Sequence, residues 1–357
     1  MKVLVGMSGG VDSSVAAHLL KEEGYEVEGL SLVLFETRGD KGPKACCTLE
    51  ALGDAAGTAE RLGIGHSTLD VRNEFIEKVV EPFVEAYMGG YTPNPCILCN
   101  RHIKFPALLR EARKRGAAFI ATGHYARVER SGGGEVLKTG VDPRKDQSYV
   151  LYALRPEELG ALVLPLGRYT KEAVREKARR LGLPAARRAE SQEICFVEGR
   201  DYPGFIAALT GEEDRPGPII DAEGRTLGSH RGIHRYTVGQ RRGLGISSPE
   251  PLYVTGVDAG KNAVYVGPRE AATAREFTVG GVNWLQEPEG ELRAGVKVRS
   301  TMRARPALVR PLAEDRAHVR FDEPQWAPSP GQAAVFYLAD SVAGGGTIEV
   351  RTRYGNL

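Results

Sequence analysis

The sequence lacks any apolar run long enough to span a membrane, and its first apolar stretch follows Met1 and Lys2 directly. We therefore expect no membrane association, no signal peptide and a cytoplasmic location. Repeats and low-complexity tracts are also absent, so 357 residues, 41% of them hydrophobic, predict a globular chain of two or three domains. The formal net charge is only +2, so a nucleic-acid surface must come from local clusters of Lys and Arg.

Cysteine is scarce: the chain has five, an odd number that favours reactive or metal-bound thiols over a disulfide framework in a reducing compartment. Cys96 and Cys99 form a CxxC pair, which is typical of a zinc half-site, a redox pair or two iron–sulfur ligands. There is no second pair for a structural zinc site, and Cys195 is the third thiol expected in the same domain. Three thiols leave one ligand position open, as catalytic metal sites do. Incidental cysteines remain the alternative, above all for Cys46 and Cys47.

The stretch MSGGVDSS at residues 7–14 lies between a short apolar run and a helical pattern. A strand, a turn of small residues and a helix N-terminus direct backbone N–H groups at one point, which predicts an anion site. It is neither a Walker A loop nor a GxGxxG fingerprint. It resembles the PP-loop of the ATP pyrophosphatases, SGGxDS, and the resemblance implies an ATP site. The residues concerned are Gly6, Met7, Ser8, Gly9, Gly10, Val11, Asp12 and Ser13.

Asp12 is unusual at such a site because a carboxylate repels a phosphate unless Mg²⁺ lies between them. We interpret Asp12 as a Mg²⁺ ligand or as a helix cap. The alternative for the whole stretch is an ordinary Gly/Ser turn whose Ser and Asp side chains cap a helix.

Alternating strand and helix patterns up to about residue 201 predict the α/β class, with a doubly wound parallel sheet of the Rossmann-like, PP-loop type. Ligands bind at the C-terminal ends of such strands, where the loop after the first strand lies. Residues 89–105 are rich in prolines and turn residues, so we expect a surface loop there. Beyond Tyr202, short alternating runs predict two smaller, mainly-β domains with a boundary near Glu270. The expected domains are 1–201, 202–270 and 271–357, the last a β-barrel.

Several motifs together are similar to those of the tRNA-specific 2-thiouridylases: GMSGGVDSSVAA, TPNPCILCNRHIKF, ATGHYAR, KDQSYVLYAL, ESQEICF, YTVGQRRGLGI and SPGQAAVFY. The resemblance runs nearly from end to end. It implies ATP- and Mg²⁺-dependent replacement of oxygen by sulfur at C2 of the wobble uridine in the tRNAs for Lys, Glu and Gln. The oxygen is adenylated first, and a sulfur-carrier or persulfide-donor protein supplies the sulfur. The central domain is then expected to bind tRNA.

The resemblance assigns roles to the thiols. Cys195 matches the persulfide-bearing cysteine, and Cys99 matches the nucleophile that attacks this persulfide, releases sulfide and leaves a disulfide with Cys195. A persulfide is acidic enough to be an anion at neutral pH. Cys96 stands where several members carry an aspartate, the supposed general base. Either Cys96 replaces that base, or Cys96, Cys99 and Cys195 hold a 4Fe-4S cluster whose fourth iron binds the transferred sulfide.

Further contacts follow from the resemblance. Leu32 and Gly123 are expected at ATP, and the wobble base, being in a single-stranded loop, can be inserted into a pocket. The expected tRNA contacts are Asn94, His124, Lys145, Asp146, Gln147, Arg303 and Gln332. The basic run RSTMRARPALVR supplies phosphate contacts if it folds onto one face with other runs. A plain turn remains the alternative for His124 and for the KDQ run.

Two other functions compete with this hypothesis. Another PP-loop synthetase acting on a small molecule would leave the CxxC motif and the β domains unexplained. A non-catalytic RNA-binding module would leave the phosphate loop without a role. ATP consumption that depends strictly on tRNA separates the thiouridylase from both.

Overall fold

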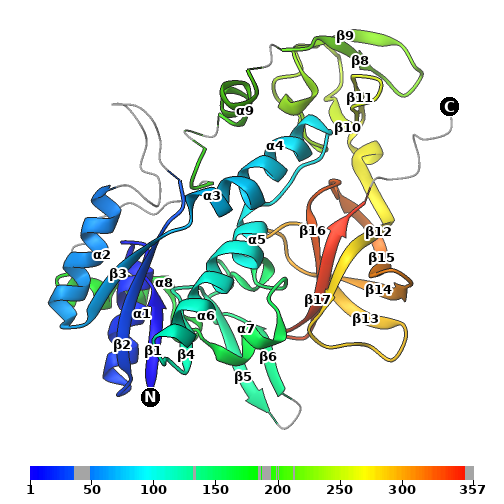
Figure 1. The fold of residues 1–357 in the computed structure, drawn as a ribbon. Coiled ribbons are helices and arrows are strands. Elements are labelled where there is room, and N and C mark those ends of the chain that lie inside the picture. The colour runs from blue at the N-terminus through cyan, green and yellow to red at the C-terminus, as the bar shows by residue number, and fades with distance from the viewer. Residues whose placement is uncertain are drawn as a thin grey trace. The chain divides into compact units, whose positions relative to one another are not determined.

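The computed structural model describes residues 1–35, 49–131, 134–183, 186, 194–197, 199, 201–211 and 214–349. The chain forms two compact units (Figure 1). Unit 1 comprises Met1–Val80, Pro95–Arg200 and Asp340–Val342, and unit 2 comprises Glu81–Asn94, Asp201–Ala339 and Ala343–Leu357. Cys46 and Cys47 lie outside the described residues. No helix in the described part of the chain is long and apolar enough to cross a membrane.

Unit 1 is built on a five-stranded sheet of order β3-β2-β1-β4-β7, in which every pairing is parallel. Its strands are β1 (Lys2–Gly6), β2 (Glu26–Val33), β3 (Gly65–Asp70), β4 (Phe119–Ala121) and β7 (Leu162–Val163). The strand order reverses next to β1, which places a ligand-binding switch point between the C-terminal ends of β1 and β4. The predicted doubly wound parallel sheet is confirmed.

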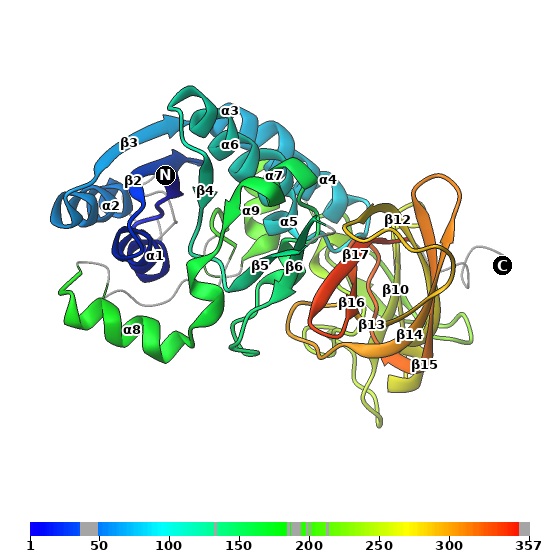
Figure 2. The ribbon, with the colours of Figure 1, turned by 90° about the horizontal axis from the view of Figure 1, so that it is seen from below.

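Helices cover both faces of this sheet. Helices α1 (Val11–Glu22) and α2 (Leu49–Leu62) pack on the face that carries Val3 and Val5. Helix α6 (Phe105–Lys114) packs on the other face, where Leu108 lies against Gly6. Helix α8 (Lys171–Arg180) lies beside α1 (Figure 2), and the two share a core of apolar side chains. Alternate strand residues therefore point to opposite helical layers, as the period of a strand requires.

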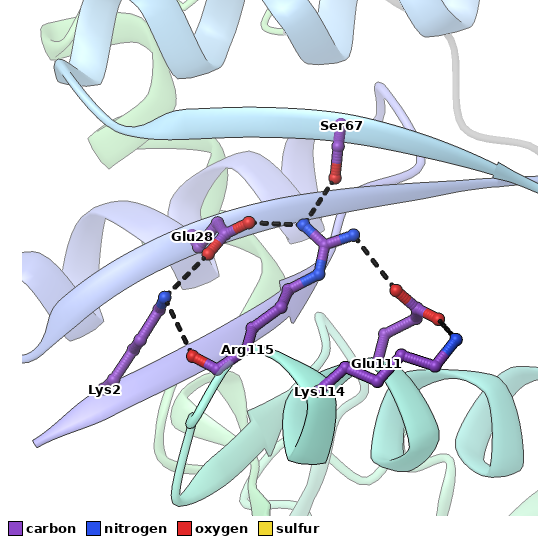
Figure 3. A network of polar contacts seen from close by, with 6 residues as sticks. All are labelled: Lys2, Glu28, Ser67, Glu111, Lys114 and Arg115. Carbon is purple, nitrogen blue, oxygen red and sulfur yellow. Dashed lines mark hydrogen bonds and ion pairs between the residues drawn. The ribbon is translucent and has the colours of Figure 1, made fainter.

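An ion-pair network ties β1, β2 and β3 to the end of α6 (Figure 3). Arg115 is its centre: the guanidinium contacts Glu28 and donates to Ser67 Oγ at 2.8 Å and to Glu111 Oε2 at 3.2 Å. Lys2 Nζ lies 3.0 Å from Glu28 Oε2 and donates to the Arg115 carbonyl at 3.1 Å. Lysine and arginine hydrogen bonds lower the pKa of Glu28 below its usual value, although burial alone would raise it.

The CxxC segment is helical, so the prediction of a surface loop over 89–105 was wrong for its second half. Helix α5 (Pro95–Cys99) continues through a π-helical stretch, η2 (Asn100–Lys104), into α6. Proline at the first helical position has the backbone angle a helix needs and loses no hydrogen bond there. Ile97, Cys99 and Ile103 are buried on one side, which is the apolar periodicity that the prolines and polar residues concealed.

The rest of unit 1 consists of short elements. These are α3 (Arg72–Phe75), η1 (Ile76–Val80), the antiparallel hairpin β5 (Ala126–Ser131) and β6 (Gly134–Thr139), η3 (Ser148–Val150), α7 (Pro156–Ala161) and η4 (Pro165–Arg168). The stretch directly after the KDQ run forms the 3₁₀ turn η3.

Unit 2 contains α4 (Glu81–Met88), α9 (Tyr202–Thr210) and two β structures. The first is a four-stranded sheet of order β10-β11-β8-β9, formed by β8 (Gly217–Ile220), β9 (Thr226–His230), β10 (Tyr253–Asp258) and β11 (Ala263–Gly267). The second is a barrel formed by β12 (Thr273–Trp284), β13 (Leu292–Lys297), β14 (Arg305–Leu312), β15 (Arg316–Trp326), β16 (Ala333–Leu338) and β17 (Ser341–Ile348). Pairing of β12 with both β15 and β17 closes the barrel. Two smaller β structures after the α/β part complete the predicted fold class.

Candidate active site

The loop after β1 has a shape that depends on glycine and serine. Gly9 has a φ of +72°, and a Cβ on it would lie 2.1 Å from the carbonyl oxygen of Ala51 in α2. Met7 is tied to β2 twice: its N–H donates to Leu30 O at 2.8 Å, and its carbonyl accepts from Ser31 Oγ at 2.7 Å. The loop therefore has room for backbone only, which is the geometry of a phosphate cradle.

The first turn of α1 leaves its N–H groups directed at this loop. Gly10 is the N-cap and has no side chain with which to cap the helix. Ser13 and Ser14 are buried and bond inward: Ser13 Oγ accepts from the Ser8 N–H at 3.1 Å, and Ser14 Oγ donates to Gly10 O at 2.9 Å. Ser8 is exposed. An anion can take the place of a capping side chain at such a helix end.

Asp12 is not the N-cap of α1, which corrects one interpretation of this residue; the other interpretation, a Mg²⁺ ligand, stays a prediction. Its carboxylate accepts from Lys171 Nζ, at 2.7 Å to each oxygen, and from the Tyr125 hydroxyl at 2.7 Å. Within the described residues, no three His, Cys, Asp or Glu side chains are placed to hold a metal ion.

The end of β4 touches both the phosphate loop and the helix that carries the CxxC pair. A Cβ on Gly123 would lie 2.7 Å from the backbone of Asp12 and of Ser13. The next residue, His124, lies with its ring 5.8 Å from that of Phe105. Its Nδ1 is 2.7 Å from Thr122 Oγ1, and burial, helped by Lys104, lowers the pKa of His124 well below its usual value. His124 is thus a neutral imidazole at physiological pH.

Two of the three predicted thiols lie on one helix. Cys99 is buried, whereas Cys96, one turn earlier, is exposed. Cys195 is partly buried, and its neighbour Phe196 packs on Phe75 and Phe35, with ring centroids 5.6 Å and 6.2 Å away. The described residues include no group of three metal-binding side chains, and the 4Fe-4S cluster stays a prediction.

The KDQ run is held firmly inside unit 1. Asp146 accepts hydrogen bonds from the N–H groups of Gly140 and Ser148 and from Ser148 Oγ, at 3.2, 3.1 and 3.0 Å. Gln147 Oε1 accepts from the Tyr125 N–H at 2.9 Å. These side chains therefore shape the segment. Contact of Lys145, Asp146 and Gln147 with tRNA stays a prediction.

The segment after the KDQ run also contacts η2, which directly continues the helix that carries Cys96 and Cys99. Asn100, which follows Cys99, is buried and donates from Nδ2 to Val150 O at 3.0 Å. Since Tyr125 contacts Asp12 and pairs with Gln147, residues 147–150 connect the phosphate loop to the helix of Cys99. Leu32, predicted at ATP, lies partly buried near the end of β2.

The remaining predicted tRNA contacts lie in unit 2. Gln332 donates from Nε2 to Thr92 O at 2.9 Å, and the Thr92 N–H donates to Pro330 O at 2.8 Å. Gln332 thus holds the start of the TPNP segment, in which Asn94 is partly buried. Arg303 is exposed between β13 and β14. Arg299, in the same basic run, donates to Val238 O, Ala327 O and Ser329 Oγ at 3.0–3.2 Å, so it stabilises the fold and is not a surface cation.

Sequence reasoning missed Lys171 and Tyr125. They lie 159 and 113 residues from Asp12 along the chain, so no local spacing indicates that they meet it. The only local sign is Thr170, the N-cap of α8, which places Lys171 at a helix start.

Three family descriptions match successive parts of the chain. Residues 1–199 match the tRNA methyl transferase HUP domain, residues 204–268 the tRNA methyl transferase PRC-barrel domain, and residues 274–348 the aminomethyltransferase beta-barrel domain. The parallel sheet, the phosphate loop and the two β structures define a PP-loop protein of the ATP-using class.

Full-length relatives narrow this class. A protein named tRNA-specific 2-thiouridylase MnmA from Geotalea uraniireducens (strain Rf4) is 48% identical, over 98% of this chain and 95% of its own. One of the same name from Moorella thermoacetica is 48% identical, over 97% of this chain and 99% of its own. MnmA 2 of Thermoanaerobacter sp. (strain X514) is 46% identical, over 98% of both chains. The chain belongs to the tRNA-specific 2-thiouridylases.

Proposed function

We propose that this enzyme uses ATP to replace the C2 oxygen of the wobble uridine in tRNA by sulfur. One observation carries the proposal: the end of β4 touches the first turn of the phosphate loop's helix through Gly123 and the helix continuing from Cys99 through His124. The residues after β4 thus contact both the helix that follows the nucleotide-binding loop and the helix that continues from the Cys99 thiol. The names of the relatives supply the substrate class.

Adenylation is the first step in this proposal. The uridine C2 oxygen attacks the α-phosphorus of ATP and pyrophosphate leaves, so the oxygen becomes part of an AMP leaving group. Backbone N–H groups at Gly9 and Gly10 and the N-terminus of α1 stabilise the phosphate charge. Mg²⁺ enters bound to ATP, as part of the substrate.

Sulfur transfer is the second step. The Cys99 thiolate attacks the inner sulfur of a persulfide on Cys195, forming a Cys99–Cys195 disulfide and releasing HS⁻. HS⁻ adds to C2 and expels AMP. A persulfide-bearing carrier protein loads Cys195, and a thiol reductant reopens the disulfide after each turnover.

Nucleoside mass spectrometry of tRNA incubated with the enzyme, ATP and a persulfide donor tests the proposal. We expect 2-thiouridine, and AMP formation only when tRNA is present. ATP consumption without tRNA would favour a small-molecule synthetase. Binding of tRNA without any ATP consumption would favour a plain RNA-binding module.

A further inference from the structure

Lys171 is a nearly buried cation at the phosphate loop. Its side chain is 7% exposed, and its ammonium makes two 2.7 Å contacts with Asp12, in the first turn of α1. Tyr125 donates to the same carboxylate and lies under the ammonium, with its ring centroid 5.5 Å from Nζ. Burying a lysine is costly, so its position beside a ligand-binding loop calls for an explanation beyond an ordinary surface ion pair.

Hydrogen bonds and a helix cap fix the backbone around Lys171. Thr170 caps α8 by accepting from the Ala173 N–H at 3.3 Å, and the buried Asp142 accepts from the Lys171 N–H at 3.2 Å. Apolar side chains of α8, Val174 among them, pack against α1 below the loop. The ammonium is therefore delivered to one point by a rigid helix start.

The charges around the Lys171 ammonium indicate which kind of ligand it can bind. From Met7 to Ala17 the sequence contains one charged residue, Asp12, so the loop and the first turns of α1 carry a net negative charge. ATP is a polyanion, and Asp12 alone would repel it. Lys171 cancels that carboxylate and supplies a cation at the N-terminus of α1, where backbone N–H groups already favour an anion.

We propose that Lys171 binds the phosphates of ATP and stabilises the departing pyrophosphate, with Asp12 and Tyr125 as its positioning residues. The inference rests on the proposed ATP-dependent function. Asp12 then serves as the anchor of this lysine. The same contact explains why a carboxylate is tolerated in a phosphate loop.

The test compares Lys171→Met with Lys177→Met. Lys177 is a matched control because it lies on the same helix and also pairs with a carboxylate of α1. Its Nζ lies 3.0 Å from Glu22 Oε2, at the end of α1 far from the phosphate loop, and its side chain is more exposed than that of Lys171. We expect Lys171→Met to weaken ATP binding in calorimetry about ten- to hundredfold, the value of a charge-assisted contact. It should leave adenosine binding unchanged and slow tRNA-dependent AMP formation at least tenfold. Lys177→Met should match wild type in all three measurements.

Lys171→Arg separates phosphate binding from a structural role. It keeps the charge, so we expect partial recovery of ATP affinity, while thermal unfolding shows whether each variant is folded. The inference is overturned if Lys171→Met binds ATP as wild type does, or if ATP and adenosine weaken by the same factor. Neither result touches the proposed function, which is tested on the wild-type enzyme by 2-thiouridine formation and by AMP formation that depends on tRNA.

Discussion

At Gly9, backbone angle and space both require glycine. The φ of +72° costs a residue with a side chain about 1–2 kcal/mol, and the Ala51 carbonyl oxygen occupies the place of a Cβ. We predict that Gly9→Ala lowers ATP affinity more than tenfold because the loop must open to fit the methyl group. Gly53→Ala in α2, where a Cβ meets nothing within 4 Å, is the control and should bind ATP normally in calorimetry. Equal affinities for both variants would contradict a tight cradle.

The thiols differ in burial, and the proposed relay assigns them different functions. With a persulfide donor, we predict that Cys99→Ser and Cys195→Ser lose at least 99% of 2-thiouridine formation, about 2.7 kcal/mol or more of transition-state stabilisation. Cys96→Asp, changed at an exposed position, should retain activity. Mass spectrometry of tRNA nucleosides measures all three. Anaerobically purified protein should be active without iron or labile sulfide, so activity that rises and falls with bound iron would instead support a cluster.

A site residue could be predicted from the sequence when the residues that it contacts lie near it along the chain. The phosphate loop is contiguous, so MSGGVDSS alone indicated its backbone geometry. The role of Asp12 depends on Lys171 and Tyr125, whose distance along the chain no spacing rule covers. Gln147 accepts from the Tyr125 N–H, 22 residues earlier, whereas the partners of Asp146, Gly140 and Ser148, lie only six and two residues away.

At the scale of elements, the spacing of apolar residues predicted the parallel sheet well and the helix of the CxxC pair, α5, poorly. Strands buried on both faces are continuous apolar runs, so β1 and β2 were apparent from the sequence. Proline interrupts helices in their interior, so Pro95 predicts a break, although at the first helical position, where it stands here, it favours a helix. The π-helical turn η2 also shifts the apolar spacing by one residue after Cys99.

The network around Arg115 should stabilise this sheet measurably. Arg115→Met removes contacts with Glu28, Ser67 and Glu111, so we predict a loss of about 1–2 kcal/mol in the free energy of unfolding, measured with urea. Arg113→Met is the control: its pair with Glu157 has side chains 65% and 47% exposed, so the loss should be below about 0.5 kcal/mol. Equal losses would show that burial of the network adds nothing.

The same network makes a pH prediction with a definite sign. The pKa of Glu28 in the folded chain lies below its usual value of 4.5, so the ionised form is the stabilising one. Its contribution is complete above about pH 4.5 and disappears as the pH falls through the lower, folded-state pKa. Glu28→Gln should therefore be less stable than wild type at pH 7, and the difference in melting temperature should vanish in acid. A difference that grows in acid would contradict this assignment.

For the molecule as a whole, mild net charge means that tRNA binding depends on a few well-placed cations. Arg299 is committed to three acceptors within unit 2, whereas Arg303, four residues later, is exposed. A basic run is therefore divided by the fold into one structural arginine and others that face solvent. Composition cannot make this distinction, since both residues lie in RSTMRARP.

Salt dependence of tRNA binding separates these two roles. Arg303→Gln should reduce the slope of log affinity against log salt by about 1, the loss of one phosphate contact, and leave the melting temperature unchanged. Arg299→Gln should lower the melting temperature, because Val238 O, Ala327 O and Ser329 Oγ lose their shared donor. Filter binding between 50 and 200 mM salt measures the slope. If Arg303→Gln leaves the slope unchanged, this surface does not contact tRNA, and the phosphate contacts must come from other basic runs.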